Sequence, residues 1–446
     1  MIKLKASLSS IINIEVFCLV MAGGALISWM EPTLAVSEFE KRELTPLPVF
    51  SLVSLFDGHY TDSLDLYYAD HFAQRENLVE FTSSLKGYFG FRQNDLMVYT
   101  RANPGMVGLD SIPVDSITTK TDPKTKHVIK KDPTGQPPET KNSIVIYNGM
   151  AFQLFGRNRS AEDNYAASVN AYSQRLGDTV RFFLCLVPSA LDFNLPDEYK
   201  SKSNHESPSI DYIYSQLNSK VLAVDAYSNL EATTNDFNFL KTDHHWSARG
   251  AYQAYLAFCE RAKLQSVSLS AYHRMVRRSF LGSLYYATLD ARLKQSGDSL
   301  EYFIPPLKMQ AWRYPTRDLQ KSIPTEVVSQ RLGKAGTYLT FIGGDYPLTQ
   351  IITENKNGKK LLMVKDSYGN ALVPFLTPHY QEVLVIDYRS FDSNIISLIK
   401  QHNISDLLFL HNISIANTKY AATRESYLMR IKDLKPVLKQ DTVMVF

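Results

Sequence analysis

Three side chains that lie far apart in the sequence, Asp243, His245 and Ser367, could together carry out nucleophilic catalysis. A serine hydroxyl is a poor nucleophile at neutral pH, so it needs an imidazole to accept its proton and a carboxylate to orient that imidazole. In an extended loop, side chains two residues apart point the same way. The carboxylate of Asp243 could then reach one ring nitrogen of His245 while the other faces the serine. The same alternation predicts that His244 points away.

The sequence around Ser367 predicts a strand, a tight turn and a helix. The apolar run 360–365 precedes the turn 366–370, and a second apolar run follows at 371–376. A nucleophile in such a turn lies at the carboxyl end of a sheet, where N–H groups at the helix start can bind an oxyanion. We expect this role for the N–H groups of Ser367 and Gly369, and we group Asn370 with them as an oxyanion or substrate-binding residue.

Both halves of this constellation also have a structural interpretation. Ser247 could cap an amphipathic helix from Ala248 to about Lys263, which would leave the adjacent histidines as ordinary loop residues. Ser367 could in the same way merely cap the helix that follows it, a role that Asp366 could also fill.

Other chemistries have little support. A metal site of Asp243, His244 and His245 for hydrolytic deacetylation lacks a remote ligand of recognisable spacing. No Gly-rich phosphate loop or paired-cysteine site occurs, so we expect no metal and no cofactor. The formal net charge is only +3 and no basic block contains interleaved aromatics, so we expect no nucleic-acid partner. Three cysteines are too few for a disulfide framework.

Alternating strand and helix patterns predict an α/β fold with a mostly parallel sheet covered by helices on both faces. The expected strands and helices include the following segments: strands 143–147, 180–187, 221–225, 360–365, 383–387 and 406–410, and helices 161–176 and 209–218. Ligands of such sheets bind at the carboxyl ends of the strands. The proline-containing region 291–339 predicts an irregular insertion that faces the substrate.

The rest of the chain suggests four segments. Residues 1–35 contain two lysines and an apolar run from about 11 to 30, which predicts a signal anchor or signal peptide with the bulk of the chain outside the cytoplasmic membrane. Residues 36–117 are expected to form a lead-in with helices. Residues 118–141, rich in Lys, Thr, Asp and Pro, predict a mobile loop or linker. The catalytic domain is expected at 142–446.

The motif Asp243-His244-His245-Trp246, followed downstream by Lys365-Asp366-Ser367-Tyr368-Gly369-Asn370, resembles the DHHW family. That family is similar to the extracytoplasmic alginate O-acetyltransferases and their SGNH-hydrolase-like domain. The resemblance implies an SGNH-like fold in which the serine follows the Asp–His pair, the reverse of the usual order. It also implies acetyl transfer to a polysaccharide, a membrane-bound O-acyltransferase as the partner that supplies the acetyl group, and a location in the cell envelope or periplasm, membrane-anchored or secreted.

Two further residues are assigned with the help of this resemblance. Gly282, in a Gly-Ser turn like one in the family, is expected to donate a backbone N–H to the oxyanion hole. Arg389 follows a predicted strand, as an Asp-x-Arg does in the relatives, and could bind an anionic sugar or stabilise charge. A surface pair of Asp387 and Arg389 is the equally plausible alternative.

The motifs leave the function open between three possibilities. If a sugar hydroxyl accepts the acyl group from an acyl-serine, the protein is an O-acetyltransferase of an exopolysaccharide or cell-envelope polysaccharide. If water resolves it, the protein is a polysaccharide acetyl esterase. A non-catalytic carbohydrate-binding assembly factor of an exopolysaccharide machine is the third, against which the intact Asp243, His245 and Ser367 argue.

Overall fold

The computed structural model describes most of residues 144–433, with gaps at 179, 235 and 330–337, together with residue 438 and shorter stretches of residues 8–99. The chain divides into two compact units. The first comprises residues 1–92 and 289–291, and the second residues 93–288 and 292–446. The predicted linker 118–141 and both of its boundaries lie outside the described residues.

The first unit contains short elements and one longer helix. Its elements are α1 (Leu8–Met30), β1 (Val36–Ser37), β2 (Arg42–Glu43), α2 (Leu52–Phe56) and α3 (His59–Asp70). Helix α1 covers the predicted apolar segment. Of the helices that the structure describes, none combines the length and apolarity that a membrane span requires. The membrane anchor therefore stays a prediction.

The second unit is built around an eight-stranded mixed sheet. From one edge to the other, its strands are β11 (Ile323–Thr325), β10 (Met309–Tyr314), β12 (Leu348–Thr353), β14 (Glu382–Asp387), β13 (Lys360–Lys365), β15 (Asp406–Asn412), β6 (Arg181–Val187) and β7 (Val221–Val224). The five strands from β14 to β7 pair in parallel. Strands β12, β10 and β11 extend the sheet through antiparallel pairings. The predicted mostly parallel arrangement is confirmed for these five strands.

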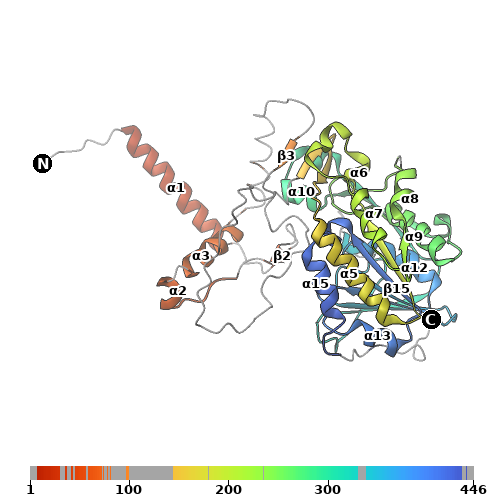
Figure 1. The fold of residues 1–446 in the computed structure, drawn as a ribbon. Coiled ribbons are helices and arrows are strands. Elements are labelled where there is room, and N and C mark those ends of the chain that lie inside the picture. Colours follow the sequence, from red (N-terminus) through yellow and green to blue (C-terminus); the bar gives the residue numbers. More distant parts are fainter. Residues whose placement is uncertain are drawn as a thin grey trace. The chain divides into compact units, whose positions relative to one another are not determined.

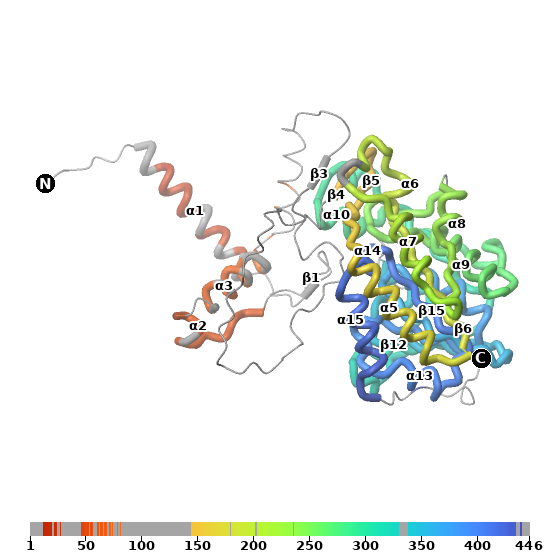
Figure 2. The backbone as a smooth tube through the Cα atoms, in the orientation of Figure 1, coloured from red at the N-terminus to blue at the C-terminus, as the bar shows by residue number. Residues whose placement is uncertain are grey.

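Helices cover both faces of this sheet. Adjacent residues of a strand point to opposite faces, so Phe182 and Phe183 of β6 mark the two sides. Tyr172 of α5 (Arg159–Leu176) contacts Phe182, whereas Phe258 of α9 (Ala248–Ala262) contacts Phe183. Helix α15 (Lys419–Leu428) packs beside α5, as Figures 1 and 2 show, and α12 (Gly369–Leu376) packs against α9. Because both faces are covered, nearly every residue of the central strands is buried.

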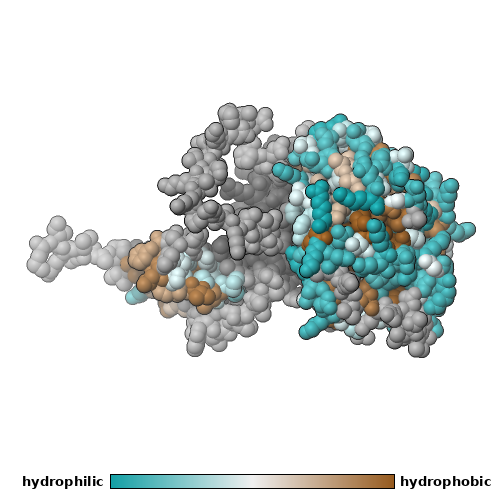
Figure 3. Space-filling view, turned by 60° about the horizontal axis from the view of Figure 1, so that its bottom comes forward, coloured by the Kyte–Doolittle hydropathy of each residue, from teal (hydrophilic) through white to brown (hydrophobic). Residues whose placement is uncertain are grey.

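The other elements of this unit lie around the sheet. The remaining helices are α6 (Leu191–Asn194), α7 (Ser207–Ser215), α8 (Ala226–Ala232), α10 (Ser283–Thr288), α13 (Ile395–His402) and α14 (Ile413–Ala416), with 3-10 turns at Asp197–Lys202, Leu269–Ala271, Tyr338–Thr340 and Thr377–His379. A separate three-stranded sheet consists of β3 (Met97–Tyr99), β4 (Ile144–Tyr147) and β5 (Met150–Gln153). The first predicted strand thus forms, but outside the central sheet. The face in Figure 3 is mainly hydrophilic, with small hydrophobic patches.

Within its described residues, the region predicted as an irregular insertion, 291–339, contains one α-helix and three strands. It contains α11 (Ala291–Ser296) and β9 (Asp298–Ile304), which pairs antiparallel with β8 (His273–Phe280) in a separate two-stranded sheet. It also supplies β10 and β11 of the central sheet. The prediction failed because the prolines lie beside or at the edge of these strands, where a missing N–H is tolerated. Pro324, for example, lies in the edge strand β11.

Candidate active site

The Asp243–Trp246 motif lies in a closed loop between α8 and α9. An antiparallel bridge between Phe239 and Trp246 closes the loop, and the N–H of Leu240 donates to the carbonyl of His245 at 3.3 Å. Ser247 then caps α9, because its Oγ accepts the N–H of Arg249 at 3.1 Å. The predicted helix and its cap are therefore confirmed, and they hold the histidines in place.

A buried carboxylate from β9 fixes the start of this loop. Asp298 accepts hydrogen bonds from the N–H of Lys241 at 2.8 Å, the N–H of Thr242 at 2.8 Å and the Thr242 hydroxyl at 2.6 Å. Thr242 Oγ1 in turn accepts the N–H of Gly282 at 2.9 Å. Three donors on one buried carboxylate restrict the backbone just before Asp243. The sequence offered no signal for Asp298.

Two aromatic residues join this loop to the turn that carries Ser367. The indole N–H of Trp246, which is fully buried, donates to the carbonyl of Tyr368 at 2.9 Å. The hydroxyl of Tyr368 donates back to the carbonyl of His244. These reciprocal bonds explain why the two motifs, which are 122 residues apart in the chain, meet in space.

The structure brings Asp243, His245 and Ser367 into one hydrogen-bonded chain. Nδ1 of His245 lies 2.6 Å from Oδ1 of Asp243, and Nε2 lies 2.7 Å from Oγ of Ser367. All three residues are at least 94% buried. In this arrangement Nδ1–H donates to the carboxylate, which leaves Nε2 to accept the serine proton.

The carboxylate of Asp243 is held in its charged form. Burial alone would raise its pKa, but His245, His244 and the N–H of Ser283 outweigh burial and hold the pKa of Asp243 well below its ordinary value. The N–H of Ser283 donates to Oδ2 at 2.9 Å. A Cβ on Gly282 would collide with the Asp243 side chain and lie 2.7 Å from its Cα. Only glycine therefore lets this turn approach the carboxylate so closely.

Gly282 was expected to donate its N–H to an oxyanion, but that N–H goes to Thr242. Its position beside Asp243 indicates instead a role in orienting the carboxylate. Ser283, the next residue, is the functional partner that the sequence analysis missed, although it stands in the Gly-Ser turn that drew attention to the site.

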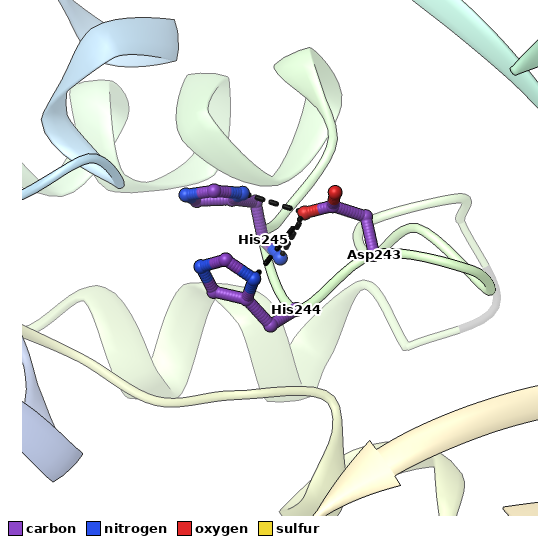
Figure 4. A group of neighbouring side chains, drawn as sticks. All are labelled: Asp243, His244 and His245. Carbon is purple, nitrogen blue, oxygen red and sulfur yellow. Dashed lines mark hydrogen bonds and ion pairs between the residues drawn. The ribbon is translucent and has the colours of Figure 1, made fainter. Parts of the chain in front are cut away.

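Two rings enclose the His245 imidazole. The ring of Tyr338 stacks on it with centroids 3.9 Å apart and planes 9° apart, and the ring of His244 lies 3.8 Å away. Two rings at such distances cannot share one face, so His245 lies between them. The prediction that His244 points away is wrong, because the loop turns at this point instead of running extended, and Figure 4 shows both imidazoles directed along the same side of Asp243. No sequence signal identified Tyr338.

The turn at Ser367 has the predicted strand, turn and helix, but the N–H of Gly369 is used locally. It donates to the carbonyl of Asp366 at 3.0 Å, and the N–H of Tyr368 donates to Oδ1 of Asp366 at 2.9 Å. Among the residues that the structure describes, the N–H of Ser367 has no acceptor, so it is the one available for an oxyanion. A Cβ on Gly369 would lie 2.6 Å from Cβ of Lys365, so this glycine allows α12 to pack against the end of β13.

Asp366 ties the serine turn to the neighbouring strand. Its Oδ2 accepts the N–H of Asn412 at 2.6 Å, at the end of β15. Burial raises the pKa of Asp366 to about 6. Ser367 itself does not cap α12, since its Oγ is engaged by His245.

Arg389 belongs to a charge cluster at the carboxyl ends of β13 and β14, in which Lys365 and Asp387 are buried and Asp345 is partly exposed. Its Nε donates to Oδ1 of Asp387 at 2.8 Å, and its guanidinium lies 3.1 Å from Oδ2 of Asp345. Nζ of Lys365 lies 2.5 Å from Asp345 and 3.4 Å from Asp387, while the amide of Asn370 donates to Asp345 at 2.9 Å. Two cations thus neutralise two carboxylates. Asp387 and Arg389 do form the ion pair that the alternative predicted. The pair is largely buried, however, whereas a surface pair was expected.

These contacts change the interpretation of Arg389 and Asn370. Both side chains were expected to face an oxyanion or substrate, yet their hydrogen bonds reach Asp387 and Asp345 behind the serine turn. Burial lowers the pKa of Arg389 to about 9. The cluster braces the segment that carries Ser367, and the predicted substrate contacts of these two residues stay predictions.

A cleft of ≈ 560 Å³, open solvent at its mouth included, lies beside the serine. Its lining includes Asp243, His244 and Ser367, apolar side chains from β5 and α6, and polar side chains at the ends of β6 and β15. Among the apolar side chains are Phe152 and Leu191, and among the polar ones are Ser189 and Asn412. Ser367 therefore faces a space lined by both apolar and polar residues.

Asp243, His244 and His245 each bring one possible ligand atom within 4.8 Å of the others. A tetrahedral zinc ion with bonds near 2 Å would hold its ligand atoms roughly 3.3 Å apart. Oδ1 of Asp243 and Nδ1 of His245 are only 2.6 Å apart, the distance of a shared proton, and Nδ1 of His244 lies 2.6 Å from Ser283. This donor geometry fits a hydrogen-bonded relay and not a metal site.

Comparison with known families agrees with this site. The family model described as DHHW protein matches residues 97–386, which span the Asp-His-His-Trp motif, the serine turn and most of the central sheet. The chain belongs to the DHHW family. No curated protein sequence matches this DHHW protein.

One solved structure supports the same assignment. A DHHW family protein from Eubacterium siraeum is 33% identical over 66% of this chain and 96% of that one, with a TM-score of 0.60. Bacillus cereus PatB1 with a sulfonyl adduct is 19% identical over 65% of this chain and 98% of that one, with a TM-score of 0.54, and shares the fold. The O-acetyltransferase domain of Pseudomonas putida AlgJ also matches, at 14% identity over 62% of this chain and 95% of that one, with a TM-score of 0.35.

Proposed function

We propose that this DHHW protein is an extracytoplasmic O-acetyltransferase with an SGNH-hydrolase-like catalytic unit, which acts on a cell-envelope polysaccharide or exopolysaccharide. The observation that carries the proposal is the uninterrupted hydrogen-bond chain from Asp243 through His245 to Ser367 beside a cleft. A serine in this setting attacks acyl groups because its proton has an acceptor and the resulting imidazolium has a carboxylate partner.

In the first half-reaction, Nε2 of His245 takes the proton from Ser367 as Oγ forms a bond to the acyl carbonyl carbon. The tetrahedral oxyanion faces the N–H of Ser367, and Asp243 stabilises the imidazolium. His245 then gives its proton to the leaving oxygen as the bond to the donor breaks, which leaves an acyl-Ser367. In the second half-reaction, His245 takes the proton of the acceptor hydroxyl, whose oxygen attacks the ester, and returns it to Ser367.

The identity of the acceptor separates the transferase from an esterase, in which water resolves the same intermediate. We favour transfer because Ser414 lines the cleft and can offer its hydroxyl to a hydroxylated acceptor. The proposed donor pathway includes a membrane-bound O-acyltransferase that supplies acetyl groups at the outer side of the membrane. The lysines and apolar run before residue 31 support the extracytoplasmic location.

The decisive experiment compares the full chain with Ser367→Ala. We expect release of 4-nitrophenol from 4-nitrophenyl acetate to fall by roughly 10³-fold or more, and an aryl sulfonyl fluoride to label the wild-type peptide that contains Ser367 but not the variant. The sulfonyl adduct in the PatB1 structure suggests this probe. Ser270→Ala, an exposed serine, is the matched control.

A gain of acetyl groups on an oligosaccharide acceptor, measured by mass spectrometry, would distinguish transfer from hydrolysis. Equal rates for wild type and Ser367→Ala, together with oligosaccharide binding, would favour the non-catalytic carbohydrate-binding alternative.

A further inference from the structure

The proposed relay uses one histidine of the motif and leaves the other, His244, without a role. Its position is nevertheless well defined. Nδ1 of His244 lies 2.6 Å from Oγ of Ser283, and the N–H of Ser283 is bonded to Asp243 at 2.9 Å. His244 is therefore fixed to the same carboxylate that orients His245, through one intervening serine.

The free edge of the His244 ring lies on the reaction side. Figure 4 shows Nε2 of both imidazoles on the side away from Asp243, and Nε2 of His245 is the atom that contacts Ser367. His244 lines the cleft beside the serine. Among the residues that the structure describes, Nε2 of His244 has no hydrogen-bond partner. A polar atom placed in this way is suited to contact a substrate.

The neighbours of His244 also determine what Nε2 can recognise. Burial, reinforced by the neighbouring His245, lowers the pKa of His244 to about 3, so the ring is neutral at physiological pH. Nδ1 lies 3.7 Å from the Asp243 carboxylate, and this negative charge favours the tautomer with the proton on Nδ1. That proton is donated to Oγ of Ser283. Nε2 is then left with a lone pair and can accept a hydrogen bond from an O–H group.

We propose that His244 is an acceptor-binding residue whose Nε2 accepts a hydrogen bond from a second hydroxyl, next to the one that attacks the acyl-serine. The two imidazoles are adjacent, with centroids 3.8 Å apart, so hydroxyls bound by the two rings must be neighbours on the acceptor. The substrate class that fits is a vicinal diol, with one hydroxyl deprotonated by His245 and the other held by His244. This inference rests on the proposed acyl transfer.

The experiment uses the full chain and separates acylation from transfer. The burst of 4-nitrophenol from 4-nitrophenyl acetate measures acylation of Ser367. Acetyl transfer is then measured to a methyl glycoside with two neighbouring hydroxyls, and to its deoxy analogue that keeps only the acceptor hydroxyl. His244→Phe preserves a ring against His245 but removes the nitrogen, whereas His244→Gln keeps an acceptor oxygen at a similar reach.

We expect wild type to prefer the diol over the deoxy analogue by roughly tenfold, the effect of one buried hydrogen bond. Because His244 also contacts His245 and Asp243, the preference is taken as the ratio of diol to deoxy transfer within each variant, which cancels any change in the burst. In His244→Phe this preference should be lost through a higher KM for the diol, and His244→Gln should restore part of it. If His244→Phe retains the preference, the inference is wrong even though the acyl transfer stands. If wild type gives neither burst nor transfer, the proposed function fails and the inference with it.

Discussion

Two clusters in the larger unit each combine a hydroxyl, an imidazole and a carboxylate, but they differ in how the carboxylate is satisfied. At the cleft, Asp243 accepts the Nδ1–H of His245 at 2.6 Å, the backbone N–H of His245 at 3.0 Å and the N–H of Ser283 at 2.9 Å. In the core, the hydroxyl of Tyr165 lies 2.7 Å from Nδ1 of His411, while Nε2 lies 3.5 Å from Glu425.

The core cluster leaves its carboxyl without donors. Within the described residues, neither oxygen of Glu425 nor Nε2 of His411 has a hydrogen-bond partner. Burial raises the pKa of Glu425 to about 8 and lowers the pKa of His411 to about 3, so both groups are neutral near pH 7. The pKa of Asp243 is instead held well below its ordinary value. The same three group types therefore give a charged carboxylate only where contacts with the histidines, together with a backbone donor, outweigh burial.

The largest effect is expected from Asp243→Asn, which removes the charge but keeps the shape. An amide cannot stabilise the imidazolium of His245, and its NH₂ can hold the ring in the wrong tautomer, so kcat for 4-nitrophenyl acetate should fall roughly 10³- to 10⁴-fold. Steady-state kinetics across pH, with circular dichroism as the control for folding, measure this. A change of only a few-fold would mean that Asp243 is not part of the relay.

A smaller loss is expected from Gly282→Ala, which tests how the carboxylate is positioned. The new Cβ would collide with Asp243 and displace it or the Ser283 turn. Displacement on the scale of an ångström should lower kcat roughly 10- to 100-fold. Gly156→Ala is the matched control, since no atom lies within 4 Å of a Cβ there. Wild-type activity in Gly282→Ala would show that catalysis does not require the close approach of the Gly282–Ser283 turn to Asp243.

The smallest effect on activity is expected from Glu425→Gln. Like Asp243→Asn at the cleft, this substitution replaces a carboxyl group by an amide of similar shape, but in the core. Activity should be unchanged, but the dependence of stability on pH should weaken. The unfolded state loses the Glu425 proton near pH 4.5, whereas the folded state keeps it until about pH 8. The free energy of unfolding contributed by this group is thus present below pH 4.5 and is lost as the pH rises to about 8.

Urea unfolding of wild type and Glu425→Gln at several pH values between 5 and 8 would measure this slope. Part of the slope should survive in the variant, because burial, with Asp192 nearby, also raises the pKa of Glu206 to about 8. Identical slopes in the two proteins would mean that Glu425 is already ionised in the folded state.

The local elements and the candidate catalytic residues could be predicted from the sequence. The uninterrupted apolar runs identified β6, β13, β14 and β15, because strands buried on both faces need apolar residues at every position. Ser247 identified the start of α9 through ordinary capping chemistry. Asp243, His245 and Ser367 were recognisable because few residue types can serve as acid, base and nucleophile, and because their motifs match a known family.

Which groups support the Asp243–His245–Ser367 hydrogen bonds depends on long-range packing. Gly282, Asn370 and Arg389 were found in the sequence but assigned to the oxyanion or substrate, since a sequence does not show which acceptor a donor meets. Asp298 and Tyr338 lie in the region 291–339, for which the sequence predicted only an irregular insertion. Their roles arise from hydrogen bonds and ring contacts with the distant loop around Asp243. Hydrogen-bond partners, burial and the resulting charge states depend on long-range packing, which no local pattern encodes.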